Sequence, residues 1–355
     1  MDWKTLIRPE IVQLKAYTVD RKGVRIRLNA NESPYPLPES VRRRVLAALE
    51  TTEFHRYPDP EAKALREVIG EWIGVAENAL LLGNGSDELI QIIATTFGEE
   101  GGVVLFPEPT FEVYRIAALT LGERPYGIPL TDDWDLPFPE ILEAIRRLHP
   151  RVIFLSYPNN PTGNCFTREK IEQILQESSG IVVLDEAYFP FSQKTFLPSL
   201  GQYDHLLILR TLSKIGMAGL RVGILIGHPA LVAEINKVRA PYNVNALSQV
   251  AARVILEEWP LIEPQIAQIV AERDRLYRKL QTIPHLTVYP SEANFFLLQC
   301  ARGGAALWEH LMAEGILVRR YPDHPMLKEM LRVTVGQPEE NEVLCQAIHR
   351  FCSQE

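Results

Sequence analysis

The sequence lacks the features that mark membrane, nucleic-acid-binding and zinc-dependent proteins. None of its apolar runs approaches the length that spans a bilayer. Its 45 acidic side chains outnumber its 37 basic ones, and the resulting net charge of −8 gives no support to a role in binding nucleic acid. Its eight histidines include no H-E-x-x-H pair or similar spacing, so we expect no metal site.

Cysteine is also scarce. The chain has Cys165, Cys300, Cys345 and Cys352, which are scattered without the spacing of metal ligands. Reduced thiols of this kind are usual in a cytoplasm. The first nine residues lack the apolar core of a signal peptide. Both observations favour a cytoplasmic protein.

The chain is long enough for two domains. Its 355 residues, of which 46% are apolar, can form two sizeable cores. From about residue 40 to Ile226, helical and short apolar segments alternate, as in a parallel sheet with covering helices. The segment 240–245 breaks this alternation. We therefore predict a large domain over residues 29–245, preceded by an N-terminal arm over residues 1–28 that packs with the small domain.

The predicted small domain, residues 246–355, begins with a long helical pattern and continues with strands and helices. The helical pattern runs from Ser248 to about Thr282, and we expect Pro260 and Pro264 to interrupt it. Four strands are predicted after it, at Leu286–Tyr289, Asn294–Gln299, Ile316–Arg319 and Leu331–Val335.

One lysine stands at the end of an apolar strand pattern. The run from Leu206 leads through Ser213 to Lys214, and Arg221 follows seven positions later. A lysine that is desolvated at a strand end can lose its proton and attack a carbonyl. A serine and an arginine beside it could hold a phosphate. This combination is typical of a Schiff base with pyridoxal 5'-phosphate, although a surface lysine after a strand is the ordinary alternative.

Two further apolar runs end in polar residues. They lead to Asn160 and to Asp185, and each is typical of a strand buried on both faces of a parallel sheet. Ligands bind just beyond the carboxyl ends of such strands. Asp185 could pair with the protonated pyridine nitrogen of the cofactor. Asn160 and Tyr188 could hydrogen-bond its ring hydroxyl. The alternative for the run from Asp185 to Tyr188 is an ordinary helix N-cap.

A glycine-rich turn between a strand and a helix could bind phosphate. We expect the helix to start at Ser86 or Asp87. Glycine lets the backbone approach a phosphate, and free N–H groups at a helix start can bind it. We assign Gly85, Ser86 and Asp87 to this cradle, with the backbone and Ser86 making the contact. Neither a dinucleotide nor an ATP-binding pattern is present in this turn. The predicted apolar face of the helix consists of Leu89, Ile90, Ile93 and Phe97.

Together these motifs resemble those of the fold-type I pyridoxal phosphate aminotransferases. The ordered set is Gly83-Asn-Gly-Ser-Asp-Glu88, Asn159-Asn-Pro-Thr-Gly163, Asp185-Glu-Ala-Tyr188, Ser213-Lys214 and Ala218-Gly-Leu-Arg221. Within that superfamily, the runs Leu28-Asn-Ala-Asn-Glu32, Arg56-Tyr-Pro58 and Leu331-Arg-Val-Thr-Val-Gly336 resemble the histidinol-phosphate aminotransferase family. The resemblance covers nearly the whole chain. It implies an α/β fold, with a large, mostly parallel sheet domain and a smaller α+β domain, in a homodimer.

The resemblance assigns further residues to the site. Phe111 takes the ring-stacking position, without the hydroxyl of the tyrosine that is more usual there. Tyr57 matches a position that reaches the cofactor phosphate of the neighbouring subunit. Arg332 would bind a substrate carboxylate or phosphate through a two-pronged contact that lysine cannot make. Weaker candidates for substrate contact are Arg319, Tyr35 and Asn294.

The sequence departs from the family pattern at two places. It has Asn31-Glu-Ser-Pro34 where Asn-Glu-Asn-Pro is more common. Lys214 and Arg221 are seven positions apart where the family commonly has eight, so the shape of that turn is open.

The implied reaction transfers the amino group of L-histidinol phosphate to 2-oxoglutarate, giving imidazole-acetol phosphate and L-glutamate in histidine biosynthesis. Lys214 would be the catalytic residue that moves the proton, while Asp185 keeps the cofactor ring electron-poor. Two alternatives stay open, because an aromatic amino acid aminotransferase and a threonine-phosphate decarboxylase share much of the same pattern.

Overall fold

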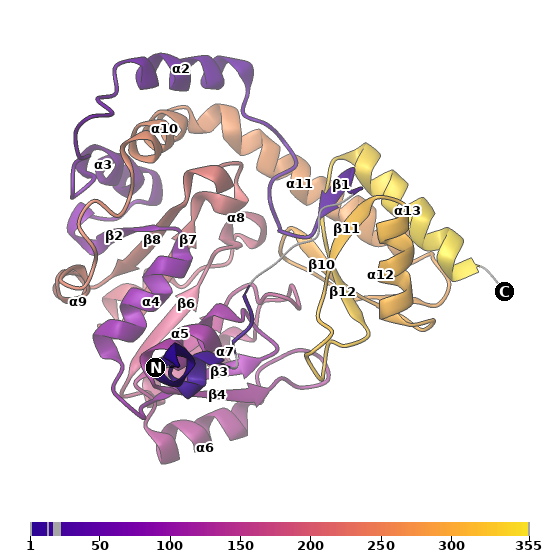
Figure 1. The fold of residues 1–355 in the computed structure, drawn as a ribbon, viewed down its shortest axis with the longest axis horizontal. Coiled ribbons are helices and arrows are strands. Elements are labelled where there is room, and N and C mark those ends of the chain that lie inside the picture. Colours follow the sequence, from indigo (N-terminus) through magenta and orange to yellow (C-terminus); the bar gives the residue numbers. More distant parts are fainter. Residues whose placement is uncertain (1, 13, 17–22, 354–355) are drawn as a thin grey trace.

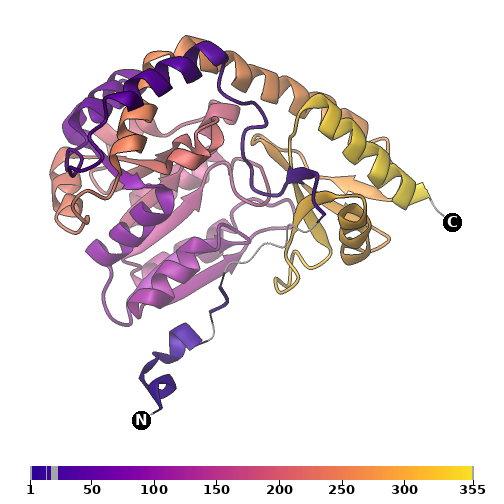
Figure 2. The same ribbon diagram turned by 45° about the horizontal axis from the view of Figure 1, so that its top comes forward.

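Two β-sheets of different size lie on either side of a junction that helix α11 (Trp259–Leu280) crosses (Figures 1 and 2). The structure is a computed structural model that describes residues 2–12, 14–16 and 23–353. Within the predicted arm, residues 1, 13 and 17–22 lie outside the described residues. The fold class is α/β, with a large, mostly parallel sheet and a smaller mixed domain, as the sequence predicts.

The large sheet is parallel except at one strand. Its order is β2-β8-β7-β6-β5-β3-β4, and β8 runs antiparallel to both of its neighbours. The other neighbouring pairs are parallel. The strands are β2 (Leu80–Asn84), β3 (Val103–Glu108), β4 (Arg124–Pro129), β5 (Val152–Ser156), β6 (Ile181–Asp185), β7 (Leu206–Thr211) and β8 (Val222–Gly227).

The central strands are apolar along their length because both faces of the sheet are covered. In β5 every residue is buried. Phe154 packs on one face with Tyr114 of α5 (Val113–Leu121), whereas Ile153 and Leu155 belong to the core on the other face. Alternate residues of a strand point to opposite faces, so two cores require a continuous apolar run.

Helices surround the large sheet on both faces. Helix α4 (Ser86–Phe97) begins at Ser86 as predicted, buries Leu89, Ile90 and Ile93, and half-buries Phe97. The others are α2 (Glu39–Glu50), α3 (Lys63–Ile73), α5, α6 (Phe138–Leu148), α7 (Arg168–Glu177), α8 (Phe189–Ser192), α9 (Pro229–Asn236) and α10 (Ala246–Glu257), and the short α1 (Pro9–Val12) lies beside α5.

The small sheet has the order β1-β11-β12-β10-β9. Its strands are β1 (Ile26–Leu28), β9 (Leu286–Val288), β10 (Phe295–Cys300), β11 (Ile316–Arg320) and β12 (Met330–Thr334), with α12 (Gly304–Ala313) and α13 (Pro338–Ser353) beside them. The four strands predicted after the long helix are confirmed. Strand β1 pairs with β11 in parallel and brings the end of the arm into the small sheet. Strand β1 is not predicted, because three residues are too few to show the alternation of a strand.

The predicted interruption at Pro264 is wrong. The chain does break before Pro260, where α10 ends and α11 starts with this proline in its first turn. Pro264, however, lies inside α11. A proline there removes one backbone hydrogen bond near the start of the helix. Burial of Ile262, Ile266 and Ile269 on one face of the same helix compensates for that loss.

The boundary between the domains stays a prediction. Helix α10 packs against α2 and α3, on the side of the large sheet (Figure 1). Helix α11 then reaches α13 and β9 of the smaller domain. We therefore propose that the boundary lies at the start of α11 rather than at residues 245 and 246.

Within the described part of the chain, no helix has both the length and the apolar character required to cross a membrane. The same residues contain no group of three or more His, Cys, Asp or Glu side chains placed to hold a metal ion.

Candidate active site

The carboxyl ends of three neighbouring strands, β5, β6 and β7, meet at the edge of the large sheet that faces the smaller domain. Asp185 is the last residue of β6, and Lys214 ends the short 3-10 turn after β7 (Leu212–Lys214). Asn160 lies four residues after β5. Because these strands are parallel neighbours, residues that are far apart in sequence lie around one site.

Lys214 is half-buried beneath the chain that enters from β1. Its Nζ donates to the carbonyl oxygen of Ala30 at 3.3 Å and lies 5.7 Å from the centre of the Tyr188 ring. Burial, and then the positive charge of Arg332, lower the pKa of Lys214 to about 8. A lysine in this state has an unprotonated fraction near neutral pH that an exposed lysine lacks.

Asp185 is buried and holds two hydrogen bonds. The phenolic oxygen of Tyr114 donates to Oδ2 at 2.7 Å, and the backbone N–H of Ala187 donates to Oδ1 at 3.1 Å. Burial raises the pKa of Asp185 to about 6. Burial and the Asp185 charge raise the pKa of Tyr114 far above its usual value, so the phenol remains a donor. The site is therefore prepared for a cation opposite Asp185, which would keep the carboxylate ionised.

Tyr114 was not predicted from the sequence. It follows Phe111 by three residues, so the two rings lie on one side of the same turn and meet edge to face at 5.7 Å. Its ring also stacks on Phe154 at 4.6 Å. The helical spacing from the predicted Phe111 could have indicated it, but an aromatic at that spacing is more often only a core residue.

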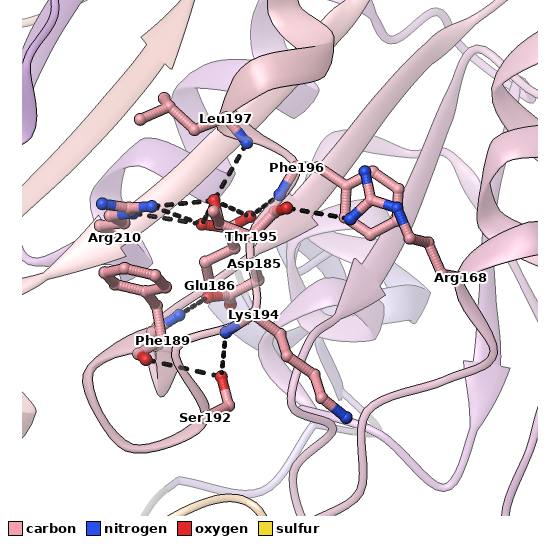
Figure 3. Close-up of polar contacts among 11 residues, drawn as sticks. Arg168, Asp185, Glu186, Phe189, Ser192, Lys194, Thr195, Phe196, Leu197 and Arg210 are labelled. Atoms are coloured by element: carbon pink, nitrogen blue, oxygen red, sulfur yellow. Dashed lines mark hydrogen bonds and ion pairs between the residues drawn. The ribbon is translucent and has the colours of Figure 1, made fainter.

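A buried ion pair supports the turn that follows Asp185. Figure 3 shows the carboxylate of Glu186 between Arg210 and Thr195. Arg210 Nη2 donates to Glu186 at 2.9 Å, and the N–H of Phe196 donates to it at 2.7 Å. All acceptor oxygens of Glu186 are thus engaged, which fixes the backbone next to Asp185.

The predicted phosphate cradle comes together at the start of α4. Arg221 reaches Ser213 Oγ at 3.5 Å and Asp87 Oδ2 at 3.1 Å. Gly85, with φ of 80°, lies directly under this guanidinium, and a Cβ there would be 2.4 Å from Arg221 Nη2. Ser86 is the first residue of α4. Arg221, seven positions after Lys214, has a left-handed φ of 53°.

Gly223 allows the cradle to close. A Cβ at this position would lie 2.4 Å from the carbonyl carbon of Gly85 and 2.5 Å from the nitrogen of Ser86. Strand β8 can therefore approach the turn only because it lacks a side chain here.

Residues of the smaller domain complete the site. Arg332 of β12 is buried, and its Nη1 and Nη2 donate to Asn160 Oδ1 at 2.5 Å and to the carbonyl oxygen of Asn29 at 2.6 Å. Its Nε has no hydrogen-bond partner among the described residues. Arg332 and the predicted Asn160 come from different domains and meet at the junction.

Asn31 connects several of these residues and was not predicted as part of the site. Its Nδ2 donates to the hydroxyl oxygen of Tyr188 at 2.9 Å, and its N–H donates to Thr334 at 2.9 Å. Asn294 is fully buried and donates to the carbonyl oxygen of Asn31 at 3.1 Å. The left-handed φ of 55° at Asn31, a conformation that asparagine tolerates, makes this turn possible.

Three predicted residues remain, namely Arg319, Tyr35 and Tyr57. Arg319 of β11 is the Cα partner of Arg332 across the β11–β12 ladder. Tyr35 is half-buried, and burial together with the charges of Glu272 and Glu339 raises its pKa. Tyr57 is 80% exposed and stacks on Tyr242 at 4.5 Å.

A family model described as aminotransferase class I and II matches residues 24–348. The chain belongs to this family. The aminotransferase is 42% identical to histidinol-phosphate aminotransferase 2 of Nitrosococcus oceani over 96% of each chain. It is 41% identical to the histidinol-phosphate aminotransferase of Aquifex aeolicus over 97% of each chain.

Solved structures share the fold of this aminotransferase. The histidinol-phosphate aminotransferase of Sinorhizobium meliloti, solved in complex with pyridoxal-5'-phosphate, matches with a TM-score of 0.87 at 24% identity. The match covers 97% of this chain and 96% of that one. The two-sheet architecture around the junction is therefore that of known aminotransferases.

Proposed function

We propose that this aminotransferase uses pyridoxal 5'-phosphate to transfer the amino group of L-histidinol phosphate to 2-oxoglutarate, in histidine biosynthesis. Relatives of that name, which are 42% and 41% identical over almost the whole chain, support the proposal. The observation that carries it is the buried guanidinium of Arg332 near Lys214, which is a site for a substrate anion. The cytoplasmic location stays a prediction.

The residues around Lys214 fit this cofactor. The start of α4, Ser213 and Arg221 offer N–H, hydroxyl and guanidinium donors for its phosphate. Asp185 offers a buried carboxylate for a protonated pyridine nitrogen. When bound, the cofactor supplies an electron sink for the carbon that carries the amino group. The half-buried ring of Phe111 would stack on it.

The chain's own groups then perform the proton transfers. Lys214, with its pKa near 8, can accept a proton at Nζ from the substrate carbon. The same amine would then donate that proton to the cofactor carbon. Asp185 stays anionic once a cation faces it, and Tyr114 holds its carboxylate in place. Asn160, which contacts Arg332, and Tyr188, which contacts Asn31, would hydrogen-bond a ring hydroxyl.

One arginine can serve both substrates. Glutamate carries an α-carboxylate, whereas histidinol phosphate carries a phosphate ester on the corresponding carbon. A guanidinium binds either group through two parallel hydrogen bonds. Arg332 is buried and is held by Asn160 and the backbone, and its unpaired Nε together with the second N–H of an Nη would make this contact.

The test is a comparison of amino donors with 2-oxoglutarate as acceptor. We expect histidinol phosphate to have a kcat/KM at least about 100-fold above that of histidinol, because a buried guanidinium without its anion costs about 3 kcal/mol. The measurement is glutamate formed per unit time, with carbon dioxide recorded in parallel.

Other results would change the assignment. A preference for phenylalanine or tyrosine over histidinol phosphate would identify an aromatic amino acid aminotransferase. Carbon dioxide release from threonine phosphate without glutamate formation would identify a decarboxylase. Equal rates for histidinol and histidinol phosphate would contradict a phosphate-binding role of this site.

We also propose that the enzyme is a homodimer in which Tyr57 serves the partner's cofactor. In one chain Tyr57 is highly exposed, and it lines a surface hollow together with Arg56 and Arg253. An exposed aromatic next to two arginines is unusual on a free surface and is common in subunit interfaces. Stacking on Tyr242 holds the Tyr57 ring in place before assembly.

Mixing two inactive variants tests this assignment. Tyr57→Ala and Lys214→Ala subunits, after exchange, should form mixed dimers with one intact site. Random pairing should restore about a quarter of the parental activity, since half of the dimers are mixed and each has one intact site of two. Mass spectrometry of the intact dimers verifies the exchange. If mixed dimers form and stay inactive, Tyr57 acts within its own chain.

A further inference from the structure

The segment between β9 and β10 of the smaller domain lies directly against the loop that follows β5. The backbone N–H of Glu292 donates to the carbonyl oxygen of Gly163 at 2.8 Å. A Cβ at Gly163 would lie only 2.9 Å from the Cβ of Ser291, so the two segments meet at backbone distance. This contact between the domains lies three positions after Asn160, which is assigned to the cofactor.

The carboxylate of Glu292 joins two loops of the large domain. Its Oε1 accepts from the backbone N–H of Cys165 at 3.2 Å, and its Oε2 pairs with Nζ of Lys194 at 2.5 Å. Cys165 belongs to the loop of Asn160, and Lys194 lies in the turn after α8, nine positions beyond Asp185. One side chain of the smaller domain therefore holds both loops that lead from β5 and β6.

The loop that carries Asn160 is braced internally. The backbone N–H of Asn159 donates to the carbonyl oxygen of Asn164 at 2.8 Å. The side-chain amide of Asn159 donates to the hydroxyl oxygen of Thr162 at 2.8 Å. Such a network makes a loop rigid, so we expect a contact at Cys165 to hold Asn160 in place as well.

Glu292 also stands next to the strands that carry Arg332. Strand β10 begins three positions after Glu292, and Leu297 of β10 is the Cα partner of Arg332 in β12. Nη1 of Arg332 then donates to Oδ1 of Asn160 at 2.5 Å. Glu292 is therefore connected to both partners of this contact, to Asn160 through the loop and to Arg332 through the small sheet.

The energy of a surface ion pair does not account for this arrangement. The side chains of Lys194 and Glu292 are 52% and 33% exposed, and pairs with such exposure contribute little to stability. Arg350 and Glu314 form a pair of nearly the same exposure, 49% and 30%, within the smaller domain. Glu314 thus offers a matched comparison, in which the ion pair is present but joins no second domain.

We propose that Glu292 is a positioning residue that holds the loop of Asn160 against the smaller domain and so sets the place of Arg332 relative to the cofactor. Lys214 and the phosphate cradle around Arg221 belong to the large domain, so loss of the Glu292 contacts leaves them intact. The substrate-anion site is what shifts. This inference rests on the proposed function, since Asn160 and Arg332 are assigned there to the cofactor and to the substrate anion.

The first test compares the holoenzymes of Glu292→Ala, Glu292→Gln and, as matched control, Glu314→Ala. We expect Glu292→Ala to raise the KM of glutamate and that of histidinol phosphate by about tenfold each, because both substrates use Arg332 and a hydrogen bond to a charged group is lost. The kcat should change less than about threefold. Glu292→Gln keeps an oxygen that can accept from Cys165, so its KM values should rise less than about threefold. Glu314→Ala should leave both constants unchanged.

A second readout requires neither cofactor nor activity. In the cofactor-free protein, hydrogen exchange at the amides of residues 159–165 should be about tenfold faster in Glu292→Ala than in the parent, because the loop loses its contact with the smaller domain. Exchange in the same loop should stay at the parent's rate in Glu314→Ala. Glu292→Gln should lie closer to the parent than to Glu292→Ala.

The outcomes separate this inference from the proposed function. If the parent does not accept histidinol phosphate, the proposed function fails, and the KM of glutamate together with hydrogen exchange still decides the role of Glu292. A raised KM with faster exchange in the loop supports that role. Unchanged KM values in Glu292→Ala would overturn it, and so would a lower Tm without faster exchange, which indicates general support of the fold. Equal losses in Glu292→Gln and Glu292→Ala would also overturn it, because the contact with Cys165 would then have no effect.

Discussion

Lys214→Ala should lower the rate of amino transfer by about 10⁴-fold or more, because no other group at this site can form the covalent link and move the proton. The fold should be kept, since the truncation removes three methylene groups and an amine that is costly to bury. The cofactor should still bind through the cradle around Arg221 and Ser213. Single-turnover measurements with each amino donor give the rate. Borohydride reduction followed by peptide mapping should place the cofactor's mass on Lys214 in the parent only.

The pH dependence of the same lysine gives a second readout. With a pKa of about 8, about a tenth of Lys214 is unprotonated at pH 7. The rate at which the cofactor-free parent captures pyridoxal phosphate should therefore rise up to pH about 8 and then level off. A rate that still rises tenfold per pH unit at pH 9 would contradict the lowered pKa. Lys237→Ala is the control, because Lys237 is exposed and pairs with Glu234.

Protein stability should follow the same titration. The folded pKa of Lys214 lies below its ordinary value of 10.5, so the native protein binds fewer protons than the unfolded chain between pH 8 and 10.5. The free energy of unfolding of the cofactor-free parent should then rise with pH across this window. Lys214→Ala should abolish that rise and should be the more stable form at pH 7.

The sequence predicted those site residues that follow a local pattern. Asp185 and Lys214 end long apolar runs, and a buried parallel strand is the simplest explanation of such runs. Ser86 and Gly85 stand where a strand meets an amphipathic helix. In each case the signal lies within about ten residues of the side chain.

The contacts that were missed join distant parts of the chain. Tyr114 is 71 positions from Asp185, and Asn31 is 157 positions from Tyr188. Neither residue differs locally from an ordinary core aromatic or a loop asparagine. The positions of these residues depend on how distant elements pack together. The local pattern of apolar and polar residues does not indicate that packing.

Asp185→Asn is expected to lower activity by about 100-fold or more, because loss of one partner of a buried charge pair costs about 3 kcal/mol or more. The amide can still occupy the space and accept the Tyr114 hydrogen bond, but it cannot keep a pyridine nitrogen protonated. The cofactor should still bind through its phosphate. Single-turnover rates and the visible spectrum of the bound cofactor measure the two effects separately.

Without the cofactor, Asp185→Asn should stabilise the protein, although it lowers the activity of the holoenzyme. Burial raises the pKa of Asp185 from 3.8 to about 6, so the native protein binds more protons than the unfolded chain between these values. The stability of the cofactor-free parent should therefore fall as the pH rises from about 4 to 6 and stay lower above it. Asp185→Asn removes that loss and should unfold at an equal or higher Tm at pH 8.

Two variants complete the test of Asp185. Tyr114→Phe removes one hydrogen bond but leaves the charge, so we expect a smaller loss of about tenfold. Asp204→Asn, at an exposed position, should leave both activity and stability unchanged. If Asp185→Asn turned over within a few-fold of the parent, the carboxylate would be only a helix cap. If Asp185 is a buried charge that faces the cofactor, activity should fall in a fixed order. The parent should be the most active, Tyr114→Phe should be less active, and Asp185→Asn should be the least active.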